Sequence, residues 1–357
     1  MKSSEPNRRS ELHSLQYLRA SAAIAVVAFH IGELFGLKLS FGALGVDLFF
    51  VVSGFVMVLA TQYKEQTPAY FLLKRIIRIV PLYWLITLTG AALALSRPNL
   101  FPNVEPQVDH VFASLFFIPH FSPAGDMFPL TGQGWTLNYE MFFYAIFGTV
   151  LFLDKRWRLI SLVATILTFV VFGLLTSPQS PLLLTYTSPL LLEFLIGVLI
   201  CKLWLNGWVL GKLLALTTVS IGLIASLAFH ISSMQANALT VGLPMGLVVY
   251  GMICLEKEGG LPNSRSLKYL GDASYSIYLA HYLPANFVEL LAAKSGWSMN
   301  LSLYLPTTLL AVGFGVLVYK FAELPITAYL SGLLSRKGAH LIIVKPQVKR
   351  LRTQKRT

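Results

Sequence analysis

The chain has 357 residues, of which 55% are hydrophobic and only 12% are charged, and its mean hydropathy is +0.66. Soluble globular domains carry about 25% charged residues, so this composition excludes an ordinary soluble protein and indicates one that crosses a membrane many times. The net charge of +12 would suit a nucleic-acid-binding protein, but the basic residues are distributed as in a membrane protein.

Windows of about 20 apolar residues predict an all-α integral membrane protein with about ten transmembrane helices. We expect one transmembrane domain over residues 12–330, followed by a basic cytoplasmic tail over residues 331–357. The predicted spans are 14–36, 43–62, 80–96, 134–153, 159–177, 188–205, 212–231, 236–255, 273–293 and 302–322.

The basic residues predict that both termini are cytoplasmic. With that orientation Lys38, Arg97 and Lys294 fall outside, Arg19 and Lys320 fall within spans, and the remaining 23 of the 28 Lys and Arg residues fall on the cytoplasmic side. This positive-inside asymmetry explains the basic charge without nucleic acid. The tail is expected to rest on anionic lipid headgroups or to be solvated.

The first predicted span carries two ionisable residues on one face. Arg19 and His30 are eleven residues apart, which is about three turns plus 20° on a helix, and they are separated by about 16 Å along its axis. Ionisable side chains inside a membrane are expensive, so this stripe predicts an interior polar path.

Arg75 and Arg78 precede the third predicted span and share one helical face. The pattern favours a positive-inside anchor that reaches lipid headgroups. The alternative is a clamp for phosphate groups, which guanidinium groups bind through paired hydrogen bonds.

The segment 97–133 is a long loop on the outer side and contains His110, His120 and Asp126. We expect either a lid or acceptor platform, or a packed cap over the bundle. Two histidines without a third ligand at suitable spacing do not predict a metal site.

In the assumed topology His30, Asp47 and Glu140 come to a similar depth on three different helices. This predicts a catalytic cluster in which a carboxylate orients a histidine base. The alternative is a hydrogen-bonded triad that locks the bundle. Trp135 and Asn138 lie in the outer half of the same helix as Glu140, as candidate substrate contacts.

Ser274, Tyr278 and His281 follow helical spacing and form a second polar stripe, which fits either core packing or substrate contact. Glu323, at the inner end of the last span, is predicted to pair with a cytoplasmic arginine. Ser53 could serve as a nucleophile, but a small residue beside Gly54 is more simply explained by helix packing.

Together these segments resemble the membrane-bound acyltransferase 3 family, which acylates sugars in bacterial surface and exported polysaccharides. The resemblance runs from about Leu12 to Pro325, and Met141 and Ala280 depart from residues common in that family. The segments are Arg19 with His30, 45–54 (GVDLFFVVSG), 75–81 (RIIRIVP), 135–140 (WTLNYE), 275–281 (YSIYLAH) and 323–325 (ELP).

The resemblance implies an O-acyltransferase in the bacterial cytoplasmic (inner) membrane. The donor would be acyl-CoA, with acetyl expected, and the acceptor a sugar hydroxyl of a polysaccharide or lipid-linked saccharide. No metal or redox cofactor is implied, and surrounding membrane lipids are expected partners. His30 would act as general base, oriented by Asp47 or Glu140, or would carry the acyl group covalently. The substrate-binding residues would be Arg19, Arg75, Arg78, Trp135, Asn138, Tyr278 and His281.

A protein of another class, a transporter or flippase for a lipid-linked sugar or acyl carrier, also suits intramembrane charges and ten helices. The absence of visible inverted repeats in the sequence argues against it.

Overall fold

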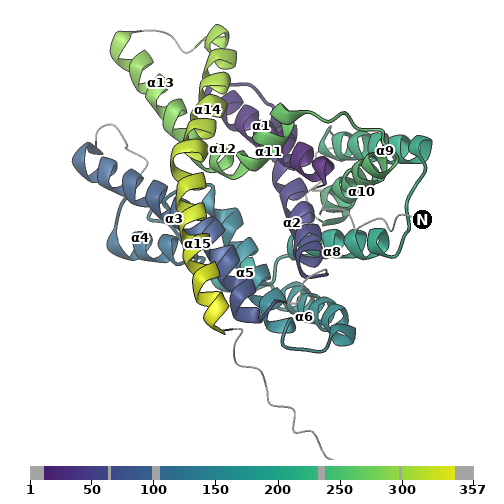
Figure 1. The fold of residues 1–357 in the computed structure, drawn as a ribbon. Helices are drawn as coiled ribbons and strands as arrows, with labels where there is room; N and C mark the ends of the chain where they lie inside the picture. Colours follow the sequence, from purple (N-terminus) through teal and green to yellow (C-terminus); the bar gives the residue numbers. More distant parts are fainter. Residues whose placement is uncertain (1–11, 63–65, 99–104, 232–237, 297–299, 342–357) are drawn as a thin grey trace, which may run out of the picture.

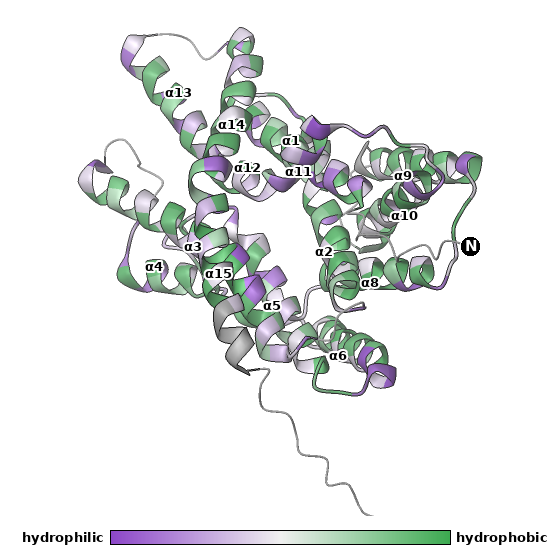
Figure 2. Cartoon of the chain, viewed as in Figure 1, coloured by the Kyte–Doolittle hydropathy of each residue, from purple (hydrophilic) through white to green (hydrophobic). Residues whose placement is uncertain are grey.

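A computed structural model describes residues 12–62, 66–98, 105–231, 238–296 and 300–341, and every regular element in these ranges is helical (Figure 1). Hydrophobic residues cover most of the helices (Figure 2). The α-helices are α1 (His13–Leu34), α2 (Leu44–Gln62), α3 (Pro68–Ser96), α4 (Val108–Leu115), α5 (Gly134–Val150), α6 (Lys155–Thr176), α7 (Pro181–Tyr186), α8 (Leu191–Leu205), α9 (Lys212–Ile231), α10 (Leu243–Lys257), α11 (Arg265–Asp272), α12 (Ser274–Ala280), α13 (Tyr282–Ser295), α14 (Tyr304–Val318) and α15 (Leu324–Leu341).

Eight of the ten predicted spans coincide with helices that are long and apolar enough to cross a membrane, counted over the described residues. The predicted span 134–153 coincides with the shorter α5, which has 17 residues. The predicted span 273–293 is wrong as a single helix, because α12 ends at Ala280 and α13 begins at Tyr282. Pro284 explains the break, since it offers no N–H to the carbonyl of Ala280 and its ring clashes with that carbonyl in a continuous helix.

The third membrane helix begins twelve residues before the predicted position 80. Thr67 caps α3 by accepting a hydrogen bond from the backbone N–H of Tyr70 at 3.3 Å, and Pro68 occupies the first turn. Arg75 and Arg78 lower the hydropathy of this stretch, and for this reason the predicted span began too late in the sequence. Both arginines therefore stand inside α3, where the helix fixes their directions.

The last membrane helix is nearly continuous from Leu301 to Ser335. A π-helical turn, Tyr319–Glu323, joins α14 to α15, and α15 runs on across the predicted boundary at residue 331. Such turns insert an extra residue and re-aim the side chains around them. Here the turn contains Glu323, which is almost completely buried. Residues 342–357 of the predicted tail lie outside the described residues.

Helices α2 and α8 pack closely along their length. A Cβ atom on Gly54 would collide with the backbone carbonyl of Phe194, and one on Gly197 would collide with that of Val51. These two glycines let the helices approach closely, as small residues do between membrane helices. The Phe194 ring then lies 4.7 Å from that of Phe50 (ring centroids), which fills the core beside the contact.

The N-terminus of α1 is held by a carboxylate at the end of α10. Glu256 accepts hydrogen bonds from the backbone N–H groups of His13 and Ser14 at 2.8 and 2.9 Å and from the Ser14 hydroxyl at 2.6 Å. A negative charge at a helix N-terminus satisfies unpaired N–H groups and complements the helix dipole. This contact fixes the position of α1 and with it the positions of Arg19 and His30.

We predict that Glu256→Ala lowers the free energy of unfolding by about 2 kcal/mol, because hydrogen bonds to charged groups contribute roughly 1.5–3 kcal/mol each and water replaces part of the loss. The melting temperature of the purified protein in detergent measures this effect. Glu258→Ala, two residues along and exposed, is the matched control. Equal melting temperatures for the two variants would show that Glu256 does not anchor α1.

Candidate functional site

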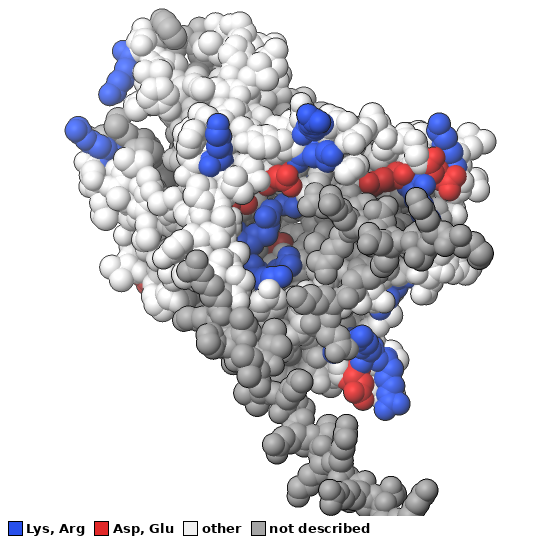
Figure 3. Space-filling view, viewed as in Figure 1, with Lys and Arg blue, Asp and Glu red and all other residues white. Residues whose placement is uncertain are grey.

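A cavity of about 110 Å³ lies between α1, α2, α3, α5 and α12. Three arginines from two helices reach it, namely Arg19 from α1 and Arg75 and Arg78 from α3. We call it the arginine cavity. Figure 3 shows Lys and Arg side chains gathered in a hollow on this face of the molecule. Its other polar lining residues include Ser53, Thr136, Glu140, Tyr144, Tyr275 and Tyr278.

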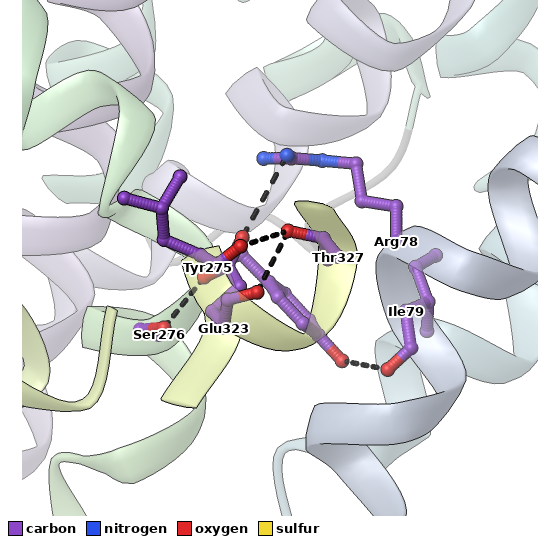
Figure 4. Close-up of polar contacts among 7 residues, drawn as sticks. Arg78, Ile79, Tyr275, Ser276, Glu323 and Thr327 are labelled. Atoms are coloured by element: carbon purple, nitrogen blue, oxygen red, sulfur yellow. Dashed lines mark hydrogen bonds and ion pairs between the residues drawn. The ribbon is translucent and has the colours of Figure 1, made fainter. Parts of the chain in front are cut away.

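An ion pair holds one wall of the arginine cavity. The Arg78 guanidinium lies 3.6 Å from a carboxylate oxygen of Glu323, as predicted for that glutamate (Figure 4). The Ser276 hydroxyl donates to the other Glu323 oxygen at 2.5 Å, and the Tyr275 hydroxyl donates to the backbone carbonyl of Ile79 at 2.8 Å. Together these bonds tie α3, α12 and the π-helical turn to one another.

Two arginine N–H groups in this cavity are buried and have no hydrogen-bond partner among the described residues. They are Nε of Arg75 and Nη2 of Arg78. The Arg75 guanidinium lies over the Tyr144 ring, 5.9 Å from its centroid, which holds it in place. Unpaired buried donors are costly, so an anionic group entering the cavity would gain charge-assisted hydrogen bonds that are ready to form.

Glu140 lies in the arginine cavity, where it accepts hydrogen bonds from Ser53 at 3.1 Å and from Tyr144. The Ser53 hydroxyl lies 3.2 Å from that of Tyr144, which closes the network between α2 and α5. Ser53 is therefore part of a polar network, and Gly54 supplies the close packing that the sequence assigned to this pair.

A second cavity, of about 530 Å³, lies where the ends of α1 and α5 meet the loop that follows α4. We call it the loop cavity. His30, Glu33, Trp135 and Tyr282 line one side, and residues of the loop, among them Asp126, line the other. His30 Nδ1 lies 3.3 Å from a Glu33 oxygen and 2.9 Å from the Tyr282 hydroxyl. A proton on Nδ1 directed at Glu33 leaves the other ring nitrogen, Nε2, as a base.

The loop that closes this cavity has its own hydrogen-bonded core. His110 Nδ1 lies 2.6 Å from His120 Nε2, and His120 Nδ1 donates to the carbonyl of Ile118 at 2.7 Å. Burial, together with the neighbouring His120, lowers the pKa of His110, although Asp109 and Asp126 act in the opposite direction. The pair thus links His110 of α4 to His120 of the loop that follows it, and serves as a structural bridge.

Tyr278 and His281 connect the linings of the two cavities. Tyr278 lines the arginine cavity, and its hydroxyl bonds the hydroxyl of Thr136 at 2.9 Å and the carbonyl of Gln133 at 3.1 Å. His281 is completely buried, donates from Nδ1 to the carbonyl of Tyr278 at 2.7 Å, and stacks on the His30 ring with 5.3 Å between centroids. Through these contacts Tyr278, in the lining of the arginine cavity, is connected to His30, in the lining of the loop cavity.

The predicted cluster of His30, Asp47 and Glu140 is not formed. Asp47 of α2 and Glu193 of α8 are both buried where these two helices pack, and neither residue lines the arginine cavity or the loop cavity. Asn138 is buried in α5 and is not among the described residues that line either cavity. Equal depth along three helices does not fix the direction of each side chain around its helix axis.

The residue that accompanies His30 is Glu33, which the sequence analysis did not single out. The spacing could have indicated Glu33, since it follows His30 by three positions and therefore lies on the same face of α1. Glu193 and Tyr282 were also missed, because each becomes informative only when its helix is placed against α2 or α1.

The chain matches a family model described as an acyltransferase domain over residues 12–320. The chain belongs to the acyltransferase 3 family. It is 38% identical over 332 residues to the exopolysaccharide production protein ExoZ of Rhizobium meliloti (strain 1021), which covers 92% of this chain and 96% of that protein. No solved structure matches it.

Two further relatives span part or most of the chain. Nodulation protein 10 of Rhizobium leguminosarum bv. viciae is 26% identical over 330 residues, covering 84% of this chain and 86% of that protein. The peptidoglycan O-acetyltransferase OatA of Listeria monocytogenes is 28% identical over 173 residues, covering 44% of this chain and 27% of that protein. This acyltransferase 3 protein is therefore a multi-pass membrane acyltransferase with an exopolysaccharide-related homologue.

We predict that Arg78→Leu lowers the free energy of unfolding of this acyltransferase 3 protein by about 2 kcal/mol. This predicted loss is smaller than the roughly 3–5 kcal/mol that breaking a fully buried ion pair costs, because the Arg78 side chain is 39% exposed. The double variant Arg78→Leu/Glu323→Leu is expected to recover much of that loss, since no unpaired carboxylate remains.

Melting temperatures of the single and double variants in detergent measure the coupling. Arg265→Leu, at an exposed position of α11, is the control for loss of one positive charge. Strictly additive effects of the two substitutions would show that the pair does not act as a unit.

Proposed function

We propose that the protein transfers an acyl group, with acetyl expected, from acyl-CoA to a sugar hydroxyl of a bacterial surface or exported polysaccharide. The observation that carries this proposal is the pair of cavities whose linings are connected through Tyr278, His281 and His30. One is lined by arginines and the other by carboxylates, aromatic rings and His30. The names of the relatives, an exopolysaccharide production protein and a peptidoglycan O-acetyltransferase, support the same class of acceptor.

We assign the arginine cavity to the donor. Acyl-CoA carries phosphates at one end and a thioester at the end of a flexible arm. The unpaired N–H groups of Arg75 and Arg78 suit phosphate oxygens, and Arg19 suits a polar group further along the arm. With both termini in the cytoplasm of a bacterial inner membrane, this cavity lies on the side on which acyl-CoA is made.

We assign the loop cavity to the acceptor. Carboxylates such as Asp126 accept hydrogen bonds from sugar hydroxyls, and the ring of Trp135 offers an apolar face for the C–H groups of a sugar. The Asp126 carboxylate is itself held in place, since it accepts from the Ser122 hydroxyl at 2.7 Å and from the backbone N–H of Phe128 at 3.0 Å. A positioned carboxylate of this kind can select one orientation of the acceptor.

In the proposed reaction Nε2 of His30 takes the proton of the sugar hydroxyl, and the hydroxyl oxygen attacks the thioester carbonyl. A carbon–oxygen bond forms, the carbon–sulfur bond breaks, and the proton on His30 passes to the departing CoA sulfur. Glu33 stabilises the imidazolium between these steps. In a route through acyl-His30 the same nitrogen attacks the thioester, so that a carbon–nitrogen bond forms and CoA leaves as the thiolate. The sugar hydroxyl oxygen then takes the acyl group as the carbon–nitrogen bond breaks, and the hydroxyl proton neutralises the thiolate.

We predict that His30→Gln reduces the acyl content of the polysaccharide at least 100-fold, because a general base contributes roughly 10²–10⁴ in rate. Acyl content is measured on polymer from cells with matched membrane levels of the variant and of the unsubstituted protein. His13→Gln, at the other end of α1, is the matched control.

The amount of polymer at the cell surface is measured in the same cells. Loss of acyl groups with unchanged polymer supports the transferase. Acylation near the unsubstituted level would rule out His30 as the base, and loss of surface polymer itself would favour a transporter.

A further inference from the structure

A third cavity, of about 80 Å³, shares no lining residue with the arginine cavity or the loop cavity. It is formed by the end of α2, the end of α5, the first turns of α6 and the end of α8. We call it the α6 pocket. Its cationic members are Lys155, Arg158 and Lys202, and among its described lining residues there is no Asp or Glu.

The three cations of the α6 pocket have different roles. Arg158 is fixed by the turn before α6, since its Nε donates to the carbonyl of Leu153 at 2.9 Å and its Nη2 to that of Leu151 at 3.1 Å. Lys155 comes from the first turn of α6 and Lys202 from the last turn of α8, so positive charge approaches the pocket from two helices. The nearby Asp154 lies 3.8 Å from Arg156, a residue outside the pocket.

The remaining walls of the α6 pocket combine polar and apolar side chains. Thr61 and Gln62 add polar groups at the rim, and Phe147, Leu162 and Val198 make the floor apolar. At roughly 10–15 Å³ per buried water, the space holds a small group of several heavy atoms, such as a phosphate with the first carbons of glycerol.

The surroundings place the α6 pocket at the level of lipid headgroups. Phe152 and Trp157 flank it on the turn and first helical turn, and they are 79% and 50% exposed. Exposed aromatic side chains next to basic residues mark the membrane interface. Only 17% of the membrane-spanning part of α6 is buried in the protein, so lipid chains can lie against it.

We infer that the α6 pocket binds the phosphate of an anionic phospholipid, whose acyl chains lie along α6 and α8. Basic pockets between membrane helices on the cytoplasmic side select such headgroups. The site takes its ligand from the bilayer, and it is independent of the acyl-transfer chemistry, since none of its residues lines the arginine cavity or the loop cavity.

The test measures retention of phosphatidylglycerol by the purified full chain in native mass spectrometry. The double variant Lys155→Gln/Lys202→Gln is compared with Lys257→Gln/Lys268→Gln, which removes two charges outside the pocket on the same basic side. Arg158 is left in place because it holds the turn before α6. At roughly 1 kcal/mol per basic residue near the lipid surface, the pocket variant should bind about 30-fold more weakly, while the control binds as the unsubstituted protein does.

Two competitors identify the source of the phosphate. Phosphatidylcholine, which has no net charge, should not displace phosphatidylglycerol at equal concentration, and inorganic phosphate should not displace it at millimolar concentration. Equal losses in the two double variants would overturn the site in favour of diffuse surface charge. Displacement by phosphatidylcholine would overturn its selectivity for anionic lipid, and displacement by inorganic phosphate would overturn its assignment to a lipid.

Discussion

The ion pair between Arg78 and Glu323 is the interaction on which the arrangement of the arginine cavity depends. A charge inside a helix bundle of this kind is stable only when another charge or a set of hydrogen bonds compensates it. Glu323 is almost fully buried, so its carboxylate needs Arg78 and Ser276, and these come from two other elements. The cost of burying one acid thus draws α3, α12 and the last helix together around one polar space.

The same constraint explains the separation of the bundle into two polar regions. Glu140 is satisfied by Ser53 and Tyr144 on the side of the arginines, whereas His30 is satisfied by Glu33 and Tyr282 on the side of the loop. Between them the hydroxyl of Tyr278 is satisfied by the first turn of α5. Each group is satisfied within its own region, which suits the proposal that donor and acceptor bind in different cavities.

The sequence predicted the membrane class, the positions of most spans and the pairing of Glu323, because these depend on composition, on periodicity and on the cost of an unpaired charge. Arg19, Arg75 and Arg78, which it offered as candidate substrate contacts, line one cavity, and their role stays a prediction. It did not predict the break at His281. A proline in the sequence does not by itself identify a break, because Pro284 interrupts its helix whereas Pro81 lies within the continuous helix α3. The burial of Asp47 where α2 and α8 pack could not be predicted at all, because the direction of a side chain around its helix depends on that packing.

If donor and acceptor bind in different cavities, substitutions in the two cavities should change different Michaelis constants. Initial rates would be measured with purified protein, acetyl-CoA and unacylated polymer from cells that lack the protein, for Arg75→Gln and for Asp126→Asn. Removal of one charged hydrogen-bonding group should raise the relevant KM by about 10-fold or more. The account predicts that Arg75→Gln raises KM for acetyl-CoA alone and that Asp126→Asn raises KM for the polymer alone. An increase of the same KM in both variants would contradict it.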